Sequence, residues 1–127
     1  MHLVRSASIP FVPASHEEQH HPGVFKKVLC DKTILQRGQV QMINWAKLPA
    51  ESSFRLHYHE DMQEIFVMVR GKVLIRVENE EAVLEPQDAV IIPPGAEHQM
   101  KNLTSSDAEY VVVGIASGQG GKTVTCV

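Results

Sequence analysis

The chain has 127 residues and a mass of 14.1 kDa, which is the size of one domain. Hydrophobic residues make up 43% of it and charged residues 21%, a composition that excludes intrinsic disorder. The formal net charge of −3 attracts neither phosphate backbones nor anionic lipid, so we expect no nucleic-acid partner and no membrane partner.

The N-terminal residues up to about 24 are rich in His, Pro and Glu, which predicts an arm lying over the domain. Within it, His16-Glu17-Glu18-Gln19-His20 matches the HExxH pattern of zinc proteases. That chemistry needs a long helix, and Pro13 before the segment and Pro22-Gly23 after it leave too little room for one. We therefore interpret the segment as a solvated, charged arm.

Beyond the arm, short alternating or apolar runs recur about every eight to twelve residues with Gly and Pro between them. This pattern is typical of an antiparallel sandwich or barrel, and no stretch shows a sustained helical stripe. Tight turns are expected at Arg70-Gly71 and at Pro93-Pro94-Gly95. The expected strands cover residues 37–45, 54–59, 65–69, 72–77, 89–92, 98–102 and 110–113. The sequence thus predicts a single all-β domain.

The C-terminal residues 118–127 are predicted to form a tail. The segment from Ala116 to Thr123 fits a relaxed phosphate-loop pattern, but only four residues follow Thr123, too few for the helix that such a loop requires. We interpret it as a flexible Gly-rich segment. The two cysteines, Cys30 and Cys126, form no CxxC pair, and no apolar run reaches the length of a signal or membrane segment. We expect a reduced, cytoplasmic protein.

The chemistry of this chain is expected at His57-Tyr58-His59, because residues two apart on a strand project from one face. Alone, such a pair is more often packing or surface histidine. Glu64, however, opens the next apolar strand, where a buried carboxylate needs a partner, and His98 enters a further strand. Three imidazoles and one carboxylate suit Mn, Fe, Co, Ni or Zn rather than calcium.

The spacing of these residues resembles the motifs of the cupin superfamily. The first motif is matched by His57, His59, Glu64 and Gly71, and the second by Pro93, Gly95, His98 and Asn102. The opening glycine of each motif is replaced, by Glu51 and by Gln87.

The resemblance is to small single-domain cupins of the type-2 conserved barrel. It implies a jelly-roll-like double-stranded β-helix barrel over residues 37–117, with residues 1–36 supplying an arm and the first strand or strands. It also implies one divalent metal ion near the mouth of the barrel, held by His57, His59, Glu64 and His98, and a backbone-fixing role for Asn102. Cupins often pair through arm residues, so we expect a homodimer, with Phe11 and Val24-Phe25 as its apolar surface.

An ion with four protein ligands keeps open positions for a small molecule. We expect a metal-dependent enzyme, either a dioxygenase-like oxidoreductase or a sugar or carbonyl isomerase. A non-catalytic module that binds or senses a metal-anchored ligand, and a structural metal domain, are the alternatives. Strand parity places Phe66, Met68 and Met100 along an apolar cup, and places Arg55 on the face of His57, where it would clamp a carboxylate or phosphate.

Overall fold

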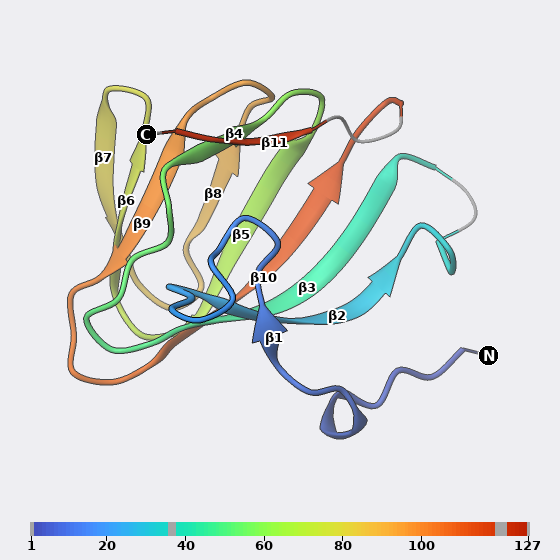
Figure 1. Cartoon of the computed structure of the whole chain (residues 1–127), viewed down its shortest axis with the longest axis horizontal. Helices are drawn as coiled ribbons and strands as arrows, with labels where there is room; N and C mark the ends of the chain where they lie inside the picture. Colours follow the sequence, from blue (N-terminus) through green and yellow to red (C-terminus); the bar gives the residue numbers. More distant parts are fainter. Residues whose placement is uncertain (1, 36–37, 119–121, 127) are drawn as a thin grey trace.

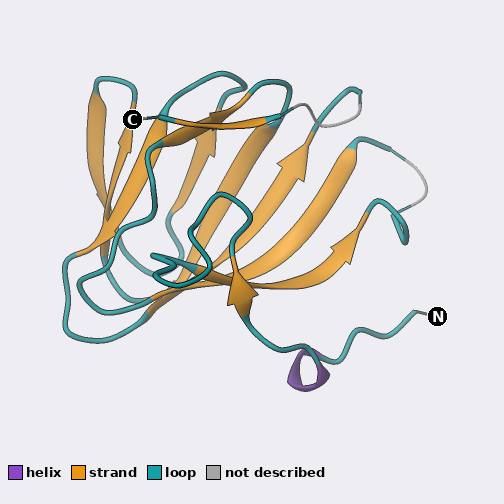
Figure 2. Cartoon of the chain, viewed as in Figure 1, coloured by secondary structure: helices purple, strands orange, loops and turns teal. Residues whose placement is uncertain are grey.

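The computed structural model describes residues 2–35, 38–118 and 122–126. Within these ranges the chain is almost entirely strand and loop, with one 3-10 turn, η1 (Ser6–Ser8), and no α-helix (Figure 2). The predicted all-β, single-domain class is confirmed. In this part of the chain no helix is long and apolar enough to cross a membrane. The predicted boundary between residues 36 and 37 lies outside the described residues, and the division into 1–36, 37–117 and 118–127 stays a prediction.

The strands form two antiparallel sheets (Figure 1). In spatial order, the larger sheet contains β1 (Val12–Pro13), β2 (Phe25–Asp31), β3 (Val40–Leu48), β10 (Ala108–Ile115), β5 (Gln63–Arg70) and β8 (Ala89–Ile92). The smaller sheet contains β11 (Thr123–Thr125), β4 (His57–His59), β9 (His98–Asn102), β6 (Val73–Val77) and β7 (Glu80–Leu84). Consecutive strands often lie in different sheets, which is how a jelly roll joins its two layers.

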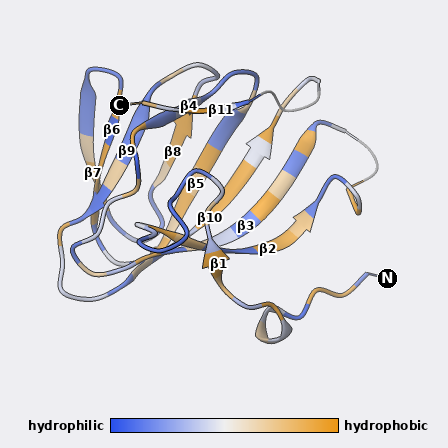
Figure 3. Cartoon of the chain, viewed as in Figure 1, coloured by the Kyte–Doolittle hydropathy of each residue, from blue (hydrophilic) through white to orange (hydrophobic). Residues whose placement is uncertain are grey.

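The core lies between the inner faces of the two sheets. Residues of β10 alternate strictly between buried and half-buried, as a strand with one face on the core requires. The largest fully buried side chains come from both sheets and from the loop before β4, and they include Leu48, Phe54, Met68, Ile75 and Met100. Figure 3 shows hydrophobic residues concentrated on β8 and β10, whereas the short strand β4 is hydrophilic.

The turns at the two replaced motif glycines keep a glycine-type backbone. Glu51 has a φ of 61° and Gln87 a φ of 77°, both in the left-handed region that L side chains rarely adopt. The glycines that remain, Gly71 and Gly95, also have positive φ, of 96° and 79°. The conformation is therefore retained at all four motif turns, with strain at the two non-glycine positions.

Two strands were not expected as separate elements, β7 and β11, whereas β1 and β2 fall within residues 1–36, where the first strand or strands were expected. The solvent-facing charge of Glu80 and Glu81 hides the strand pattern of β7. β11 lies in the predicted flexible tail, yet Thr123 to Thr125 pair with β4, because the edge of that strand needs a hydrogen-bonding partner. Val24, expected on a dimer surface, is only 2% exposed within a single chain. The homodimer stays a prediction.

Candidate metal centre

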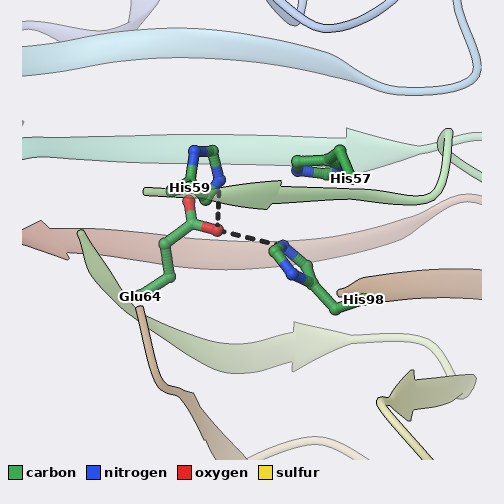
Figure 4. A group of neighbouring side chains, drawn as sticks. All are labelled: His57, His59, Glu64 and His98. Atoms are coloured by element: carbon green, nitrogen blue, oxygen red, sulfur yellow. Dashed lines mark ion pairs between the residues drawn. The ribbon is translucent and has the colours of Figure 1, made fainter. Parts of the chain in front are cut away.

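Four side chains from three strands converge at one end of the core (Figure 4). His57 and His59 project from β4, and His98 projects from β9, where its Cα is paired with that of His57. Glu64 crosses from the larger sheet, from β5. All four side chains are buried, and one donor atom from each lies within 4.8 Å of the others. The two sheets are therefore joined at this point by polar rather than apolar groups.

The Nδ1 atom of each histidine of the cluster makes a hydrogen bond that holds the ring in place. His57 Nδ1 donates to the carbonyl of Arg55 at 2.6 Å, and His98 Nδ1 donates to the carbonyl of Ala96 at 2.9 Å. A carbonyl only accepts, so in the neutral rings Nε2 carries the lone pair. His59 Nδ1 lies 2.9 Å from the hydroxyl of Thr123 in β11. Such bonds fix the orientation of metal-ligating imidazoles.

Three of the atoms that point into the cluster lie close together. His59 Nε2 lies 2.9 Å and His98 Nε2 3.2 Å from Glu64 Oε1, but all three atoms are buried without a hydrogen-bond partner in the described part of the chain. A cation between these atoms would satisfy the lone pairs of all three. The residues present thus fit a metal ion.

The ionisation states support this fit. Burial raises the pKa of Glu64, but the approach of the His59 and His98 rings outweighs burial and lowers the pKa to about 2. Burial, followed by the neighbouring His98 ring, lowers the pKa of His57 to about 4. At neutral pH the cluster therefore presents an anionic carboxylate and a neutral His57 imidazole, which are the forms that bind metals.

His16 and Glu17 of the N-terminal segment also lie at this site, so their interpretation as part of a solvated arm is wrong. The His16 ring stacks on His57, with centroids 3.8 Å apart and planes 21° apart. Glu17 accepts a hydrogen bond from the Gly23 amide at 2.6 Å and one from the Arg55 amide at 2.9 Å. The side chains of His16 and Glu17 are 15% and 2% exposed. The sequence did not predict that these two residues lie at the site, because no local sequence pattern predicts a contact between residues 16 and 57.

A cavity of about 120 Å³, partly open to solvent, lies beside the cluster and is lined by His57, His59 and Glu64. Phe54 and Phe66 line it, and Phe66 was expected there. Met68 and Met100, also expected on the cup, are buried in the core and are not among the residues that line this cavity.

The prediction that Arg55 shares the face of His57 is wrong. β4 begins at His57, so the alternation does not extend back to residue 55. Phe54 is buried and lines the cavity, whereas the Arg55 side chain is exposed and lines a separate surface hollow with Glu17 and Glu18. Only the backbone of Arg55 serves the site, through its bonds to His57 and Glu17.

The fold and the four converging side chains are those of a cupin. The family model described as "Cupin domain" matches residues 44–114, which include both motifs, and the chain belongs to this family. An uncharacterized protein of Methanocaldococcus jannaschii is 28% identical over 83 residues, covering 65% of this chain. The chain spans 58% of the length of that relative.

Solved structures show the same architecture. A predicted oxalate decarboxylase from Thermotoga maritima superposes with a TM-score of 0.79 at 25% identity, covering 91% of this chain and 99% of that one. A sugar phosphate isomerase of the cupin superfamily from Silicibacter pomeroyi gives a TM-score of 0.73 at 21% identity, covering 91% of this chain and 76% of that one. At 21% identity, the similarity to the isomerase shows only that the two proteins share a fold.

Proposed function

We propose that the protein is a metal-dependent enzyme that binds one divalent transition-metal ion through His57, His59, Glu64 and His98 and acts on a small molecule. The observation that carries this proposal is the convergence of four buried donor atoms within 4.8 Å beside a cavity that is partly open to solvent. Three imidazoles and a carboxylate are a donor set for Mn, Fe, Co, Ni or Zn. Four protein ligands leave open positions on an ion that accepts five or six, and an open position distinguishes catalytic from structural sites.

A bound divalent ion supplies Lewis acidity toward a substrate oxygen. The chain's own residues do the rest. The carbonyls of Arg55 and Ala96 hold the His57 and His98 rings in one orientation, and Glu64 contributes the negative charge. Phe54 and Phe66 line the adjoining cavity with apolar surface, which disfavours water beside the reacting atoms.

The reaction class is an oxidoreductase reaction, including a dioxygenase-like one, or an isomerisation of a sugar or other carbonyl compound. The names of two structural neighbours, an oxalate decarboxylase and a sugar phosphate isomerase, support a small-molecule substrate. Oxygen consumption by the iron-loaded protein assigns the oxidoreductase class, and carbonyl isomerisation without oxygen uptake assigns the other. Ligand binding without turnover supports a binding or sensing module instead.

The metal itself is tested by elemental analysis of protein purified without added metal, before and after incubation with Mn²⁺ or Zn²⁺. We expect about one ion per chain and its loss in His98→Ala, because His98 is fully buried and supplies a donor atom. His20→Ala, which alters an exposed histidine of the arm, is the control and should keep the ion. Equal metal content in the parent protein and in His98→Ala would overturn the proposal.

A further inference from the structure

The cavity beside the metal centre has a second polar region, formed by Ser15 of the arm, Lys26 of β2 and Asn44 of β3. None of these residues belongs to the four-residue cluster, and none is part of a cupin motif named above. The strand register explains why Lys26 and Asn44 are together. Lys26 is paired with Ala46, and Asn44 lies two residues before Ala46 on the same face of β3. Such diagonal neighbours are roughly 7–8 Å apart, within reach of a lysine side chain.

The same register directs these side chains toward the metal centre. Asn44 is paired with Val112 of β10, and Val112 is paired with Phe66 of β5, which lines the cavity two residues after Glu64. The inner face of the larger sheet thus runs from Lys26 and Asn44 across β10 to the carboxylate of the cluster. One cavity is polar at both ends and apolar between them.

Asn44 is a buried amide without adequate partners. The residue is 5% exposed, its Oδ1 has no hydrogen-bond partner in the described part of the chain, and its Nδ2 reaches only the sulfur of Met42 at 3.3 Å. A sulfur is a weak acceptor, and a buried polar group left unpaired costs about 1–3 kcal/mol. An amide in this state, lining a cavity, points to a ligand that completes its hydrogen bonds.

Lys26 is a half-buried cation with spare donors. Its Nζ donates to Ser15 Oγ at 2.9 Å, which uses one of three protons. Among the described residues no carboxylate forms an ion pair with it. Burial lowers the pKa of the ammonium group, and the charge of Glu64 acts in the opposite direction. A cation in such a position is stabilised by an anion placed against it.

We propose that Lys26, Ser15 and Asn44 bind the anionic end of the small molecule whose opposite end faces the metal centre. The ligand class is therefore a small compound with a carboxylate or phosphate at one end and a metal-binding oxygen at the other. Lys26 pairs with the anionic group, and Asn44, whose amide can present either its oxygen or its NH₂ group, bonds to that group or to a neighbouring hydroxyl. This inference rests on the proposed function and specifies its substrate class.

The test is calorimetric titration of the Mn²⁺-loaded protein with malonate, succinate and glutarate, with butyrate as the singly charged comparison and phosphoglycolate as the phosphate arm. We expect a diacid or phosphoglycolate to bind more tightly than butyrate by about tenfold or more, since hydrogen bonds to charged groups contribute about 1.5–3 kcal/mol. Preference for a diacid identifies carboxylate as the anionic group, and preference for phosphoglycolate identifies phosphate.

The variant is Lys26→Met, which removes the charge and keeps most of the length of the side chain, and it should abolish the preference for the doubly charged ligands. Lys27→Met is the matched control, because Lys27 Nζ bonds instead to the carbonyl of Ser6 and does not line the cavity. Asn44→Ala is titrated in parallel, and it should weaken binding of the same ligand. This variant supplies the test if Lys26→Met fails to fold. A parent protein that binds metal but does not discriminate, or a Lys26→Met protein that still does, would overturn this inference alone. A parent protein that does not bind metal would instead overturn the proposed function.

Discussion

His16 stacks on His57, with ring centroids 3.8 Å apart, so a residue of the N-terminal segment covers one of the four side chains of the candidate metal centre. Phe54 packs edge-on against both rings, at centroid distances of 5.7 Å from His16 and 5.3 Å from His57. Burial, and next the His57 ring, lowers the pKa of His16 to about 3, so the stacked ring is neutral at pH 7. The segment before β2 is therefore part of the wall of the cavity.

The first prediction concerns the role of His16. We expect His16→Ala to retain the metal content of the parent protein while lowering Tm, since the stacked ring contributes about 1 kcal/mol of packing but is not one of the four converging donors. Elemental analysis and thermal unfolding measure the two effects. His20→Ala, at an exposed position of the same segment, should change neither. Metal loss as complete as in His98→Ala would show that His16 is a ligand.

The second prediction concerns the anchor of the same segment. Glu17→Gln replaces a carboxylate oxygen by an NH₂ group facing the amide of Gly23 or of Arg55, so one buried bond becomes a contact between two donors. We expect a loss of about 1–3 kcal/mol in the free energy of unfolding, measured by urea titration. Glu18→Gln is the matched control, because its side chain is exposed, and it should stay within about 0.5 kcal/mol of the parent. Equal stability of the two variants would show that Glu17 does not anchor the segment.

The convergence of His57, His59, Glu64 and His98 was largely predictable because its determinants are local or lie on strands. The parity of His57 and His59 requires only that both belong to one strand, and β4 contains these residues and Tyr58 alone. The same reasoning failed for Arg55, because the two-residue alternation of a strand was extended to residue 55, which precedes the first residue of β4. Periodicity describes extended backbone and says nothing about the loop that precedes it.

What could not be predicted depends on contacts between distant parts of the chain. The stacking of His16 on His57 arises from the path of the loop between β1 and β2, which has no repeat in its sequence. The pairing of Lys26 with Ala46 depends on the register between β2 and β3, which neither strand specifies by itself. The larger sheet therefore contributes to the cavity in ways that only the folded structure makes visible.

The third prediction concerns Asn102, whose expected backbone-fixing role is confirmed. Its Nδ2 donates to the carbonyls of Leu48, Pro49 and Ser106 at 3.1, 3.2 and 2.8 Å, and its Oδ1 accepts from the amide and the hydroxyl of Thr104. Because the side chain is fully buried, Asn102→Ala leaves several of these groups unpaired. We expect a loss of about 2–4 kcal/mol in the free energy of unfolding.

Chemical unfolding monitored by tryptophan fluorescence measures this loss, with the neighbouring exposed residue as the control. Lys101→Ala should lie within about 0.5 kcal/mol of the parent. If Asn102→Ala were as stable as Lys101→Ala, the three carbonyls would have to find other donors, and the side chain would not fix the turn.

The last prediction reverses the usual effect of glycine. At most strand positions glycine destabilises, because it increases the conformational freedom of the unfolded chain. Glu51 and Gln87 occupy positive φ, where a non-glycine residue costs about 1–2 kcal/mol, and the described structure gives neither side chain a hydrogen bond that would be lost. We therefore expect Glu51→Gly and Gln87→Gly each to raise the free energy of unfolding, by up to about 1 kcal/mol.

Glu81→Gly is the control, and it should lower the free energy of unfolding in the same experiment. Glu81 is an exposed residue of β7 and is not among the residues with positive φ, so its replacement should cost about 0.5–1 kcal/mol. The two stabilising substitutions lie in different turns, whose backbone amides bond to Thr104 and to Met68 respectively, so their effects should add within about 0.5 kcal/mol in the double variant. Destabilisation by both Glu51→Gly and Gln87→Gly would mean that these side chains contribute more to the folded state than their backbone strain removes.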